Sequence, residues 1–140
     1  MTVSDCVFCK IISGQIPSLK LYEDQNVLVF LDIGPISDGH TLVVPKQHFT
    51  RLDECPAEML GSIGACLGKI SKAVAEAMNA DGYNVLCNNG RAAGQLVEHL
   101  HFHIIPRKNG DGVFNRWPAY NYEKGKAEEL AKKIKGKLSV

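Results

Sequence analysis

The feature that most constrains the fold is a short stretch, HLHFHII over residues 99–105, in which histidines alternate with apolar residues. Successive side chains on a β-strand point to opposite faces, so a strand here places three imidazoles on one face and apolar side chains on the other. At a rise of about 3.3 Å per residue, His99 and His103 are about 13 Å apart at the backbone. One metal ion needs its nitrogen ligands at about 2.0–2.1 Å, so the outer pair cannot easily share an ion. The pattern therefore predicts a half-buried strand that carries a site, and argues against a single centre made of all three histidines.

Short apolar runs separated by turn residues indicate the rest of the fold. We expect strands at residues 19–23, 26–31, 41–44, 83–87 and 96–105. Pro45 and Pro106 are expected to end the third and fifth strands, because proline cannot donate to a strand ladder. Behind Pro56, apolar residues recur at three- and four-residue steps as far as Ala77, the period of an amphipathic helix. Shorter helices are expected at residues 6–13 and 123–138. The sequence thus predicts a single α+β domain over residues 1–140, an antiparallel five-stranded sheet with one long helix and short flanking helices.

Composition argues against several classes of protein. The chain has 16 Lys and Arg against 15 Asp and Glu, a formal charge of +1, so no basic surface for nucleic acid is expected. No apolar run approaches the roughly 20 residues needed to cross a bilayer, and the first residues do not form a secretory signal. The five cysteines are an odd number and three stand alone, which favours a reducing compartment over a disulfide framework. We therefore expect a cytoplasmic protein without a nucleic-acid or membrane partner.

The remaining two cysteines form the motif Cys6-Val-Phe-Cys9, which is compatible with a redox pair, with structural thiols or with half of a zinc site. A redox motif is expected at the strand-to-helix junction of a thioredoxin-like fold, which the strand order does not suggest. Zinc is the sharper interpretation, because two thiolates and two imidazoles make a closed tetrahedral set.

The histidine stretch resembles the signature of the histidine triad (HIT) family of nucleotide hydrolases and transferases. Other blocks that resemble the family follow in the same order along residues 6–107, while the extension over residues 108–140 carries no family pattern. These blocks are Cys6-x-x-Cys9-Lys-Ile-x-x-Gly14-x-Ile16-Pro17, Asp32, His40-x-Leu-Val-x-Pro-Lys-x-His48, and Asn88 with Ala-Gly94-Gln95-x-Val97. The resemblance implies a HIT fold and a homodimer whose strands continue across the interface.

The resemblance also implies catalytic roles for His101, His103 and His40. His101 would attack the α-phosphorus of an AMP-containing purine nucleotide, and His103 would bind phosphate oxygens or assist the leaving group. Imidazole suits the first role because its neutral form has a free lone pair near pH 7. Its second nitrogen must then hold the proton and donate it to an acceptor such as a backbone carbonyl. A covalent nucleotidyl-histidine would divide one displacement into two steps.

Nucleotide-binding residues are implied in the same way. Asp32 would accept hydrogen bonds from the ribose hydroxyls, and the loop with Asn88, Gly94 and Gln95 would approach the phosphate. An apolar slot for the base is implied at Phe8, Ile11, Ile16, Phe30 and Ile33. One position departs from the family: Leu96 stands where many members have Ser or Thr, so the leaving-group preference is in question.

Some bacterial HIT proteins carry the Cys-x-x-Cys pattern, and there two histidines complete a zinc site. The corresponding set here is Cys6, Cys9, His48 and His99, a closed structural site that leaves His101 and His103 for chemistry. The leading hypothesis is thus a nucleoside phosphoramidate or dinucleoside polyphosphate hydrolase. The alternatives are a nucleotide-binding regulatory module with slow or incidental hydrolysis, and a metalloenzyme that uses the His-x-His pair.

Overall fold

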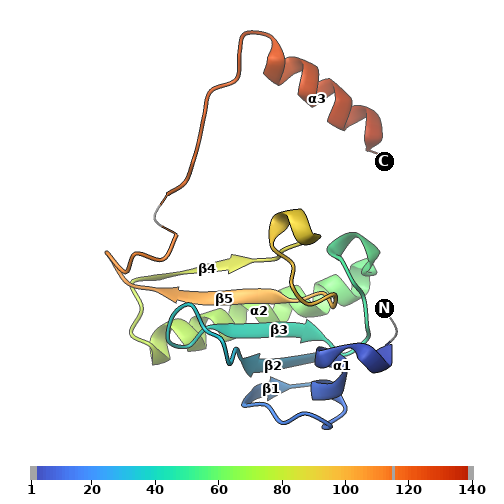
Figure 1. Cartoon of the computed structure of the whole chain (residues 1–140), viewed down its shortest axis with the longest axis vertical. Helices are drawn as coiled ribbons and strands as arrows, with labels where there is room; N and C mark the ends of the chain where they lie inside the picture. The colour runs from blue at the N-terminus through green and yellow to red at the C-terminus, as the bar shows by residue number, and fades with distance from the viewer. Residues whose placement is uncertain (1–2, 115, 139–140) are drawn as a thin grey trace.

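Five short runs of aliphatic and β-branched residues pair into one antiparallel sheet. The computed structural model describes residues 3–114 and 116–138. The strands follow the order β1-β2-β3-β5-β4 across the sheet (Figure 1). Their bounds are β1 Lys20–Glu23, β2 Val27–Leu31, β3 Thr41–Pro45, β4 Gly82–Leu86 and β5 Phe102–Arg107.

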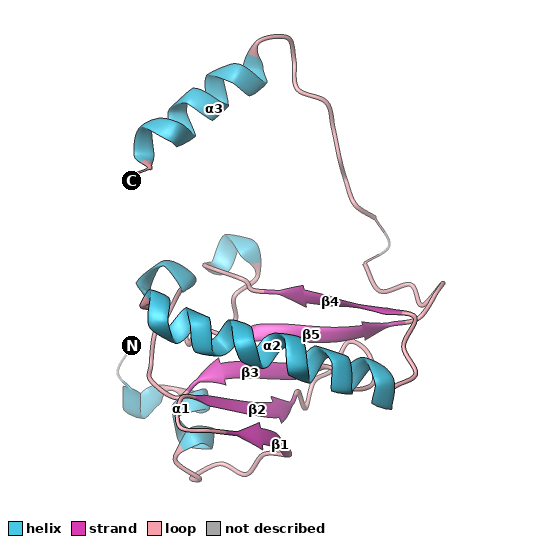
Figure 2. Cartoon of the chain, turned by 180° about the vertical axis from the view of Figure 1, so that it is seen from behind, coloured by secondary structure: helices cyan, strands magenta, loops and turns pink. Residues whose placement is uncertain are grey.

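Helices cover both faces of this sheet. The long α2 (Ala57–Ala77) crosses one face, and the short α1 (Val7–Ile12) lies at the other (Figures 1 and 2). A third helix, α3 (Lys126–Lys137), stands clear of the sheet at the end of a long connection. Three single 3₁₀ turns complete the structure: η1 Val3–Asp5, η2 Leu52–Glu54 and η3 Arg91–Ala93. None of the described helices is long and apolar enough to span a membrane.

The alternation of side chains along the strands produces two separate apolar clusters. The cluster under α2 joins strand residues such as Val29, Val43 and Ile104 to Ile63 and Ile70 of the helix. The opposite cluster joins Leu28, Phe30, Leu42 and Val44 to Phe8 and Ile11 of α1. Leu100 and Ile104 belong to the first cluster, so the imidazoles that alternate with them face the α1 side of the sheet.

The predicted α+β architecture is confirmed, but two boundaries at β5 were wrong. β5 begins at Phe102, so His99 and His101 lie in the segment that leads into the strand. The strand also continues through Pro106, which pairs with Tyr83. Pairing between β3 and β5 ends at Thr41 and Ile104, so Pro106 has only β4 beside it and its missing N–H interrupts no central ladder. Pro45 is likewise accommodated as the last residue of β3.

Candidate active site and metal centre

The three histidines of the stretch line one side of the sheet beside α1. The ring of Phe8 meets the rings of His99 and His101 edge-on, at centroid distances of 5.9 and 5.1 Å. The rings of His101 and His103 follow at 4.9 Å. The single imidazole face expected from the alternation is therefore present, although the strand itself begins only at Phe102.

His101 has one ring nitrogen occupied and one bare. Its Nδ1–H donates to the carbonyl oxygen of His99 at 2.7 Å, so the proton of the neutral ring lies on Nδ1 and Nε2 keeps its lone pair. Only 6% of the residue is exposed, and this burial lowers the pKa of His101 below its ordinary value. The geometry is that required of a neutral nitrogen nucleophile.

His40 and His103 form a directly hydrogen-bonded pair next to the ring of His101. The backbone N–H of Ile36 donates to Nδ1 of His40 at 3.2 Å, so a neutral His40 carries its proton on Nε2. That Nε2–H donates to Nδ1 of His103 at 2.8 Å, which places the remaining proton of His103 on its Nε2. Asp32 Oδ2 lies 3.6 Å from the same nitrogen of His40. The pair therefore offers an N–H donor on a ring whose centre lies 4.9 Å from that of His101.

Burial keeps this group of imidazoles neutral. Desolvation, followed by the neighbouring rings of His101 and His40, lowers the pKa of His103 to about 4. Desolvation also lowers the pKa of His40, which the nearby Asp32 carboxylate partly opposes. At neutral pH both rings can therefore accept and donate a proton, as the chain of hydrogen bonds requires.

A second cluster lies at the other end of the stretch and joins Cys6, Cys9, His48 and His99. Cys6 Sγ lies 3.3 Å from His99 Nδ1, and Cys9 Sγ lies 3.4 Å from His48 Nδ1 and 3.6 Å from His99 Nδ1. All four ligand atoms lie within 4.8 Å of one another. Tetrahedral zinc with ordinary bond lengths separates sulfur and nitrogen ligands by about 3.5 Å. The four side chains expected from the sequence thus fit a closed zinc site.

The position of the proton on His99 leaves its other ring nitrogen available to bind a metal ion. Its Nε2–H donates to the carbonyl oxygen of Pro45 at 2.8 Å, which leaves Nδ1 bare and directed at the thiols. Burial, together with Cys6, raises the pKa of the Cys9 thiol to about 11. The Cys9 thiol therefore holds its proton until a cation of high thiolate affinity displaces it. Cys6 also begins α1, since its sulfur accepts the backbone N–H of Cys9.

The loop over residues 88–95 directly precedes the histidine stretch, and the side chain of Gln95 is hydrogen-bonded to backbone groups around it. Its Nε2 donates to the carbonyl oxygens of Thr50 and Val97, and its Oε1 accepts the N–H of Gly90. Gln95 is 4% exposed and connects the loop to Thr50, and its contact with a phosphate stays a prediction. Gly94 adopts a φ of +89°, and Asn88 Nδ2 donates to its carbonyl oxygen.

The residues of the expected base slot are only partly brought together. Phe8, Ile11 and Phe30 are buried in the α1 cluster and Ile16 packs against it. Ile33 is 93% exposed and joins no part of that cluster. Leu96 is 92% exposed on the loop that enters the histidine stretch, so its substitution would leave no cavity.

Sequence reasoning missed the groups that set these proton positions. They are backbone atoms, namely the N–H of Ile36, which contacts His40, and the carbonyl oxygen of Pro45, which contacts His99. A backbone atom carries no residue-type signal. The one available clue is spacing, since Ile36 lies four residues before His40.

His99 and His101 directly precede β5 and His103 lies within it, with His99 at a pair of thiols and His103 paired with His40. This arrangement defines an α+β domain built around a histidine triad. A family model described as the HIT domain matches residues 13–110. An uncharacterized HIT-like protein of Methanocaldococcus jannaschii is 49% identical over 94% of this chain and 99% of its own length. An adenosine 5'-monophosphoramidase of Schizosaccharomyces pombe is 44% identical over 93% of this chain and 98% of its own length. The chain belongs to the HIT family.

Solved structures agree with this assignment. A HIT family protein from Bacillus subtilis is 39% identical and superimposes with a TM-score of 0.90 over 97% of this chain and 99% of its own. A Streptococcus mutans protein, also 39% identical, gives a TM-score of 0.93 over 99% of this chain and 88% of its own. A histidine triad family protein from Mycobacterium smegmatis, described as zinc-bound, is 37% identical with a TM-score of 0.75 over 97% of this chain and 100% of its own.

Proposed function

We propose that this protein is a nucleotide hydrolase that cleaves the α-phosphate linkage of AMP-containing nucleoside phosphoramidates or dinucleoside polyphosphates. The observation that carries the proposal is the bare Nε2 of His101, held in that form by the hydrogen bond from Nδ1 to the His99 carbonyl. The name of the Schizosaccharomyces pombe relative, adenosine 5'-monophosphoramidase, supports the same substrate class. The name of an Arabidopsis thaliana relative, adenylylsulfatase, supports an adenylyl compound as substrate more generally; this relative is 49% identical over 77% of this chain and 55% of its own length.

In the first step, the lone pair of His101 Nε2 forms a bond to the α-phosphorus, and the bond to the leaving group breaks. The leaving group takes the proton from Nε2–H of His103, whose Nδ1 stays hydrogen-bonded to His40. Water then attacks the nucleotidyl-histidine and gives a proton back to Nε2 of His103, while the bond from phosphorus to His101 Nε2 breaks, AMP is released and His101 recovers its lone pair. Two fast displacements thus replace one slow one.

The surrounding residues bind and orient the nucleotide in this proposal. Asp32 receives the ribose hydroxyls, and the loop that carries Asn88 and Gly94 approaches the phosphate. Phe8 and the apolar residues around it hold the purine. Zinc bound by Cys6, Cys9, His48 and His99 would supply structural cross-linking, since four protein ligands leave no open coordination position.

The test is to trap the intermediate. Protein mixed with adenosine 5'-phosphoramidate and quenched in base, where phosphohistidine survives, should gain the mass of one adenylyl group on the peptide that contains His101. His101→Asn should show no adduct and at least about a 10³-fold lower turnover, with AMP binding retained. Turnover within tenfold of the unsubstituted protein would contradict the role of His101. Binding without any turnover in the unsubstituted protein would favour a nucleotide-binding module.

A further inference from the structure

His40 and His103 lie on different segments, the loop over residues 32–40 and strand β5, and a second hydrogen bond joins these two segments. The hydroxyl of Ser37 donates to the carbonyl oxygen of Pro106 at 2.7 Å. Ser37 lies three residues before His40, and Pro106 lies three residues after His103. The bond between the two imidazoles and the bond from Ser37 are therefore three residues apart on both segments. The loop is thus fixed to β5 at two points.

The carbonyl oxygen that accepts the Ser37 bond lies beyond the part of β5 that pairs with β3. That pairing ends at Thr41 and Ile104, two residues before Pro106. Pro106 is buried, and a buried carbonyl group needs a hydrogen-bond donor. The hydroxyl of Ser37 supplies a donor at this place, so the bond serves the strand as well as the loop.

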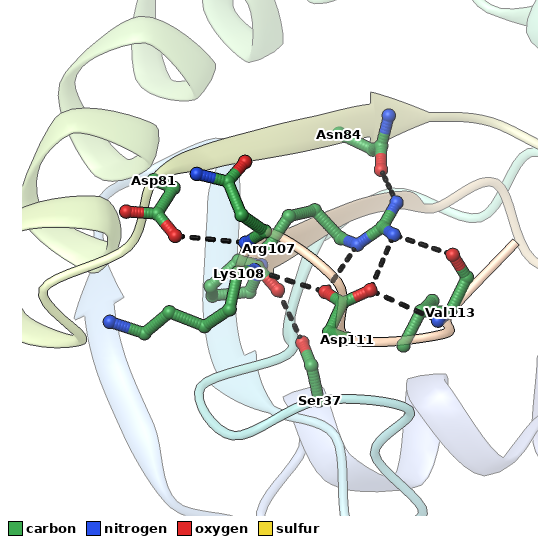
Figure 3. Close-up of polar contacts among 9 residues, drawn as sticks. Ser37, Asp81, Asn84, Arg107, Lys108, Asp111 and Val113 are labelled. Atoms are coloured by element: carbon green, nitrogen blue, oxygen red, sulfur yellow. Dashed lines mark hydrogen bonds and ion pairs between the residues drawn. The ribbon is translucent and has the colours of Figure 1, made fainter.

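The end of β5 that accepts this bond is itself held by several hydrogen bonds. Arg107, which follows Pro106, donates two hydrogen bonds to Asp111 and one to Asn84 of β4. Figure 3 shows the side chain of Ser37 directed from its loop toward this group. The carbonyl oxygen that fixes Ser37 therefore belongs to a strand end that is cross-linked on its other side.

Close packing brings the loop near enough to β5 for the bond to form. Gly39 has a φ of +87°, and a Cβ atom there would lie 2.6 Å from Cγ of Met78 and 3.3 Å from the ring of Pro106. Only glycine fits so close an approach in this conformation. The backbone N–H of His40 donates to the carbonyl oxygen of Ser37 at 3.1 Å. The position of Ser37 is therefore passed to His40 through the backbone.

The N–H group that sets the proton position on His40 comes from the same turn. Ile36, next to Ser37, donates its backbone N–H to Nδ1 of His40 at 3.2 Å. The Asp32 carboxylate is 3.6 Å from Nε2 of His40, so the Ile36 contact is the shorter of the two. Without the Ser37 bond this N–H is free to turn away from the ring, and His40 can then carry its proton on either nitrogen. The Nε2–H that donates to His103 is then present only part of the time.

We propose that Ser37 is a positioning residue for the pair formed by His40 and His103. Its bond to β5 holds the Ile36 N–H at Nδ1 of His40, which keeps the proton of His40 on the nitrogen that faces its partner. Ser37 acts through His40 and not on the substrate. Its effect on turnover rests on the proposed function, in which His103 protonates the leaving group, whereas its effect on the proton of His40 does not.

Nitrogen-15 NMR of the histidine rings tests the proton position in the full-length, zinc-loaded protein without any substrate. Near neutral pH, His40 should show one protonated and one bare ring nitrogen, assigned by their loss in His40→Gln. Ser37→Ala should bring these two resonances closer together as the two tautomers exchange, and Ser37→Thr, which keeps the hydroxyl, should restore them. Ser62→Ala removes a hydroxyl that donates to the carbonyl oxygen of Glu58 in α2, so it is the matched control and should change neither. Unchanged His40 resonances in Ser37→Ala would overturn the proposal.

Kinetics with a double substitution measure the consequence for turnover. Ser37→Ala should lower kcat about tenfold with KM nearly unchanged, and Ser37→Thr should keep most of the rate. In a protein that already carries His40→Leu, Ser37→Ala should lower kcat no further, because the proton that Ser37 positions is gone. A full tenfold loss in that background, with folding checked by circular dichroism, would show that Ser37 supports only the fold and would overturn the proposal. If the unsubstituted protein turns over no nucleotide, the proposed function fails, and the ring resonances of His40 still decide the role of Ser37.

Discussion

Two groups of possible metal ligands lie at opposite ends of the histidine stretch, and they differ in where their protons are. The first group, the thiol cluster, consists of Cys6, Cys9, His48 and His99. In it, Nε2–H of His99 donates to the Pro45 carbonyl, so Nδ1 of His99 has no proton and faces the sulfur atoms. The second group, Asp32, His40 and His103, is called the Asp32 cluster here. In it, the Ile36 N–H donates to Nδ1 of His40, so the nitrogen that faces His103 carries a proton and cannot bind a metal. Distances alone do not separate the two groups, because both have ligand atoms within 4.8 Å. The hydrogen bond on the other ring nitrogen decides whether a histidine serves as ligand or as proton donor.

The largest expected effect is on the thiol cluster. The purified protein should hold about one zinc per chain, and Cys9→Ser should remove most of it and lower the melting temperature by about 10 °C or more. Cys87→Ser, which alters a half-buried thiol outside the cluster, is the matched control. Metal analysis and thermal unfolding measure both. If the protein bound a second zinc tightly and His40→Gln lost it, the Asp32 cluster would also be a metal site, which would contradict the difference between the two clusters.

The next effect concerns the proton on His40. His40→Leu removes the donor to His103 and should lower kcat about 10²-fold, with AMP affinity nearly unchanged. His40→Gln can place an amide N–H near the position of Nε2 and should recover much of the rate. Steady-state kinetics with a phosphoramidate substrate, together with AMP titration, measure the two variants. Equal losses in both would indicate that His40 acts through packing and not as a donor.

A smaller effect should appear in the pH dependence of stability. The pKa of His103 is about 4 in the folded protein and about 6.5 when unfolded, so the unfolded chain binds more protons between these values. The contribution of neutral His103 is thus complete above about pH 6.5 and is lost as the pH falls toward 4. We expect it to be on the order of 1–2 kcal/mol. Denaturant unfolding of His103→Gln across this window should show a flatter profile than the unsubstituted protein, and parallel profiles would contradict the assignment.

The smallest expected effect is at Leu96, which lies three positions before His99 in the sequence. Leu96→Ser adds a hydroxyl where a departing group gains charge, so kcat/KM for phosphoramidates should rise a few-fold, with little change for dinucleoside polyphosphates. The side chain is 92% exposed, so the stability should not change. The two substrate classes are compared in both proteins, with Leu96→Ala as the control for lost bulk. An equal change in kcat/KM for both substrate classes would show that Leu96 does not determine the leaving-group preference.

The two clusters also differ in how much of each could be predicted from the sequence. The alternation around His101 places the imidazoles on one face because the two-residue period of a strand is a local property. The thiol cluster follows from recognisable residue types. The proton on His40 does not, because a backbone N–H in a loop sets it. The hydrogen bonds of Gln95 do not follow from the sequence either, because its amide donates to the Thr50 carbonyl, 45 positions away.

Zinc bound at the thiol cluster would restrict the conformations of the unfolded chain. Cys6 and His99 are 93 positions apart, so a zinc ion held between them closes a loop that contains most of the sheet and all of α2. Closing a loop of that size removes conformational entropy from the unfolded chain, which for a disulfide of similar span is worth about 4–5 kcal/mol. Unlike a disulfide, a zinc cross-link is not broken by reductants, but it is removed by chelators and by acid. The closing of this loop by zinc would thus tie the folded lifetime of the protein to the supply of metal around it.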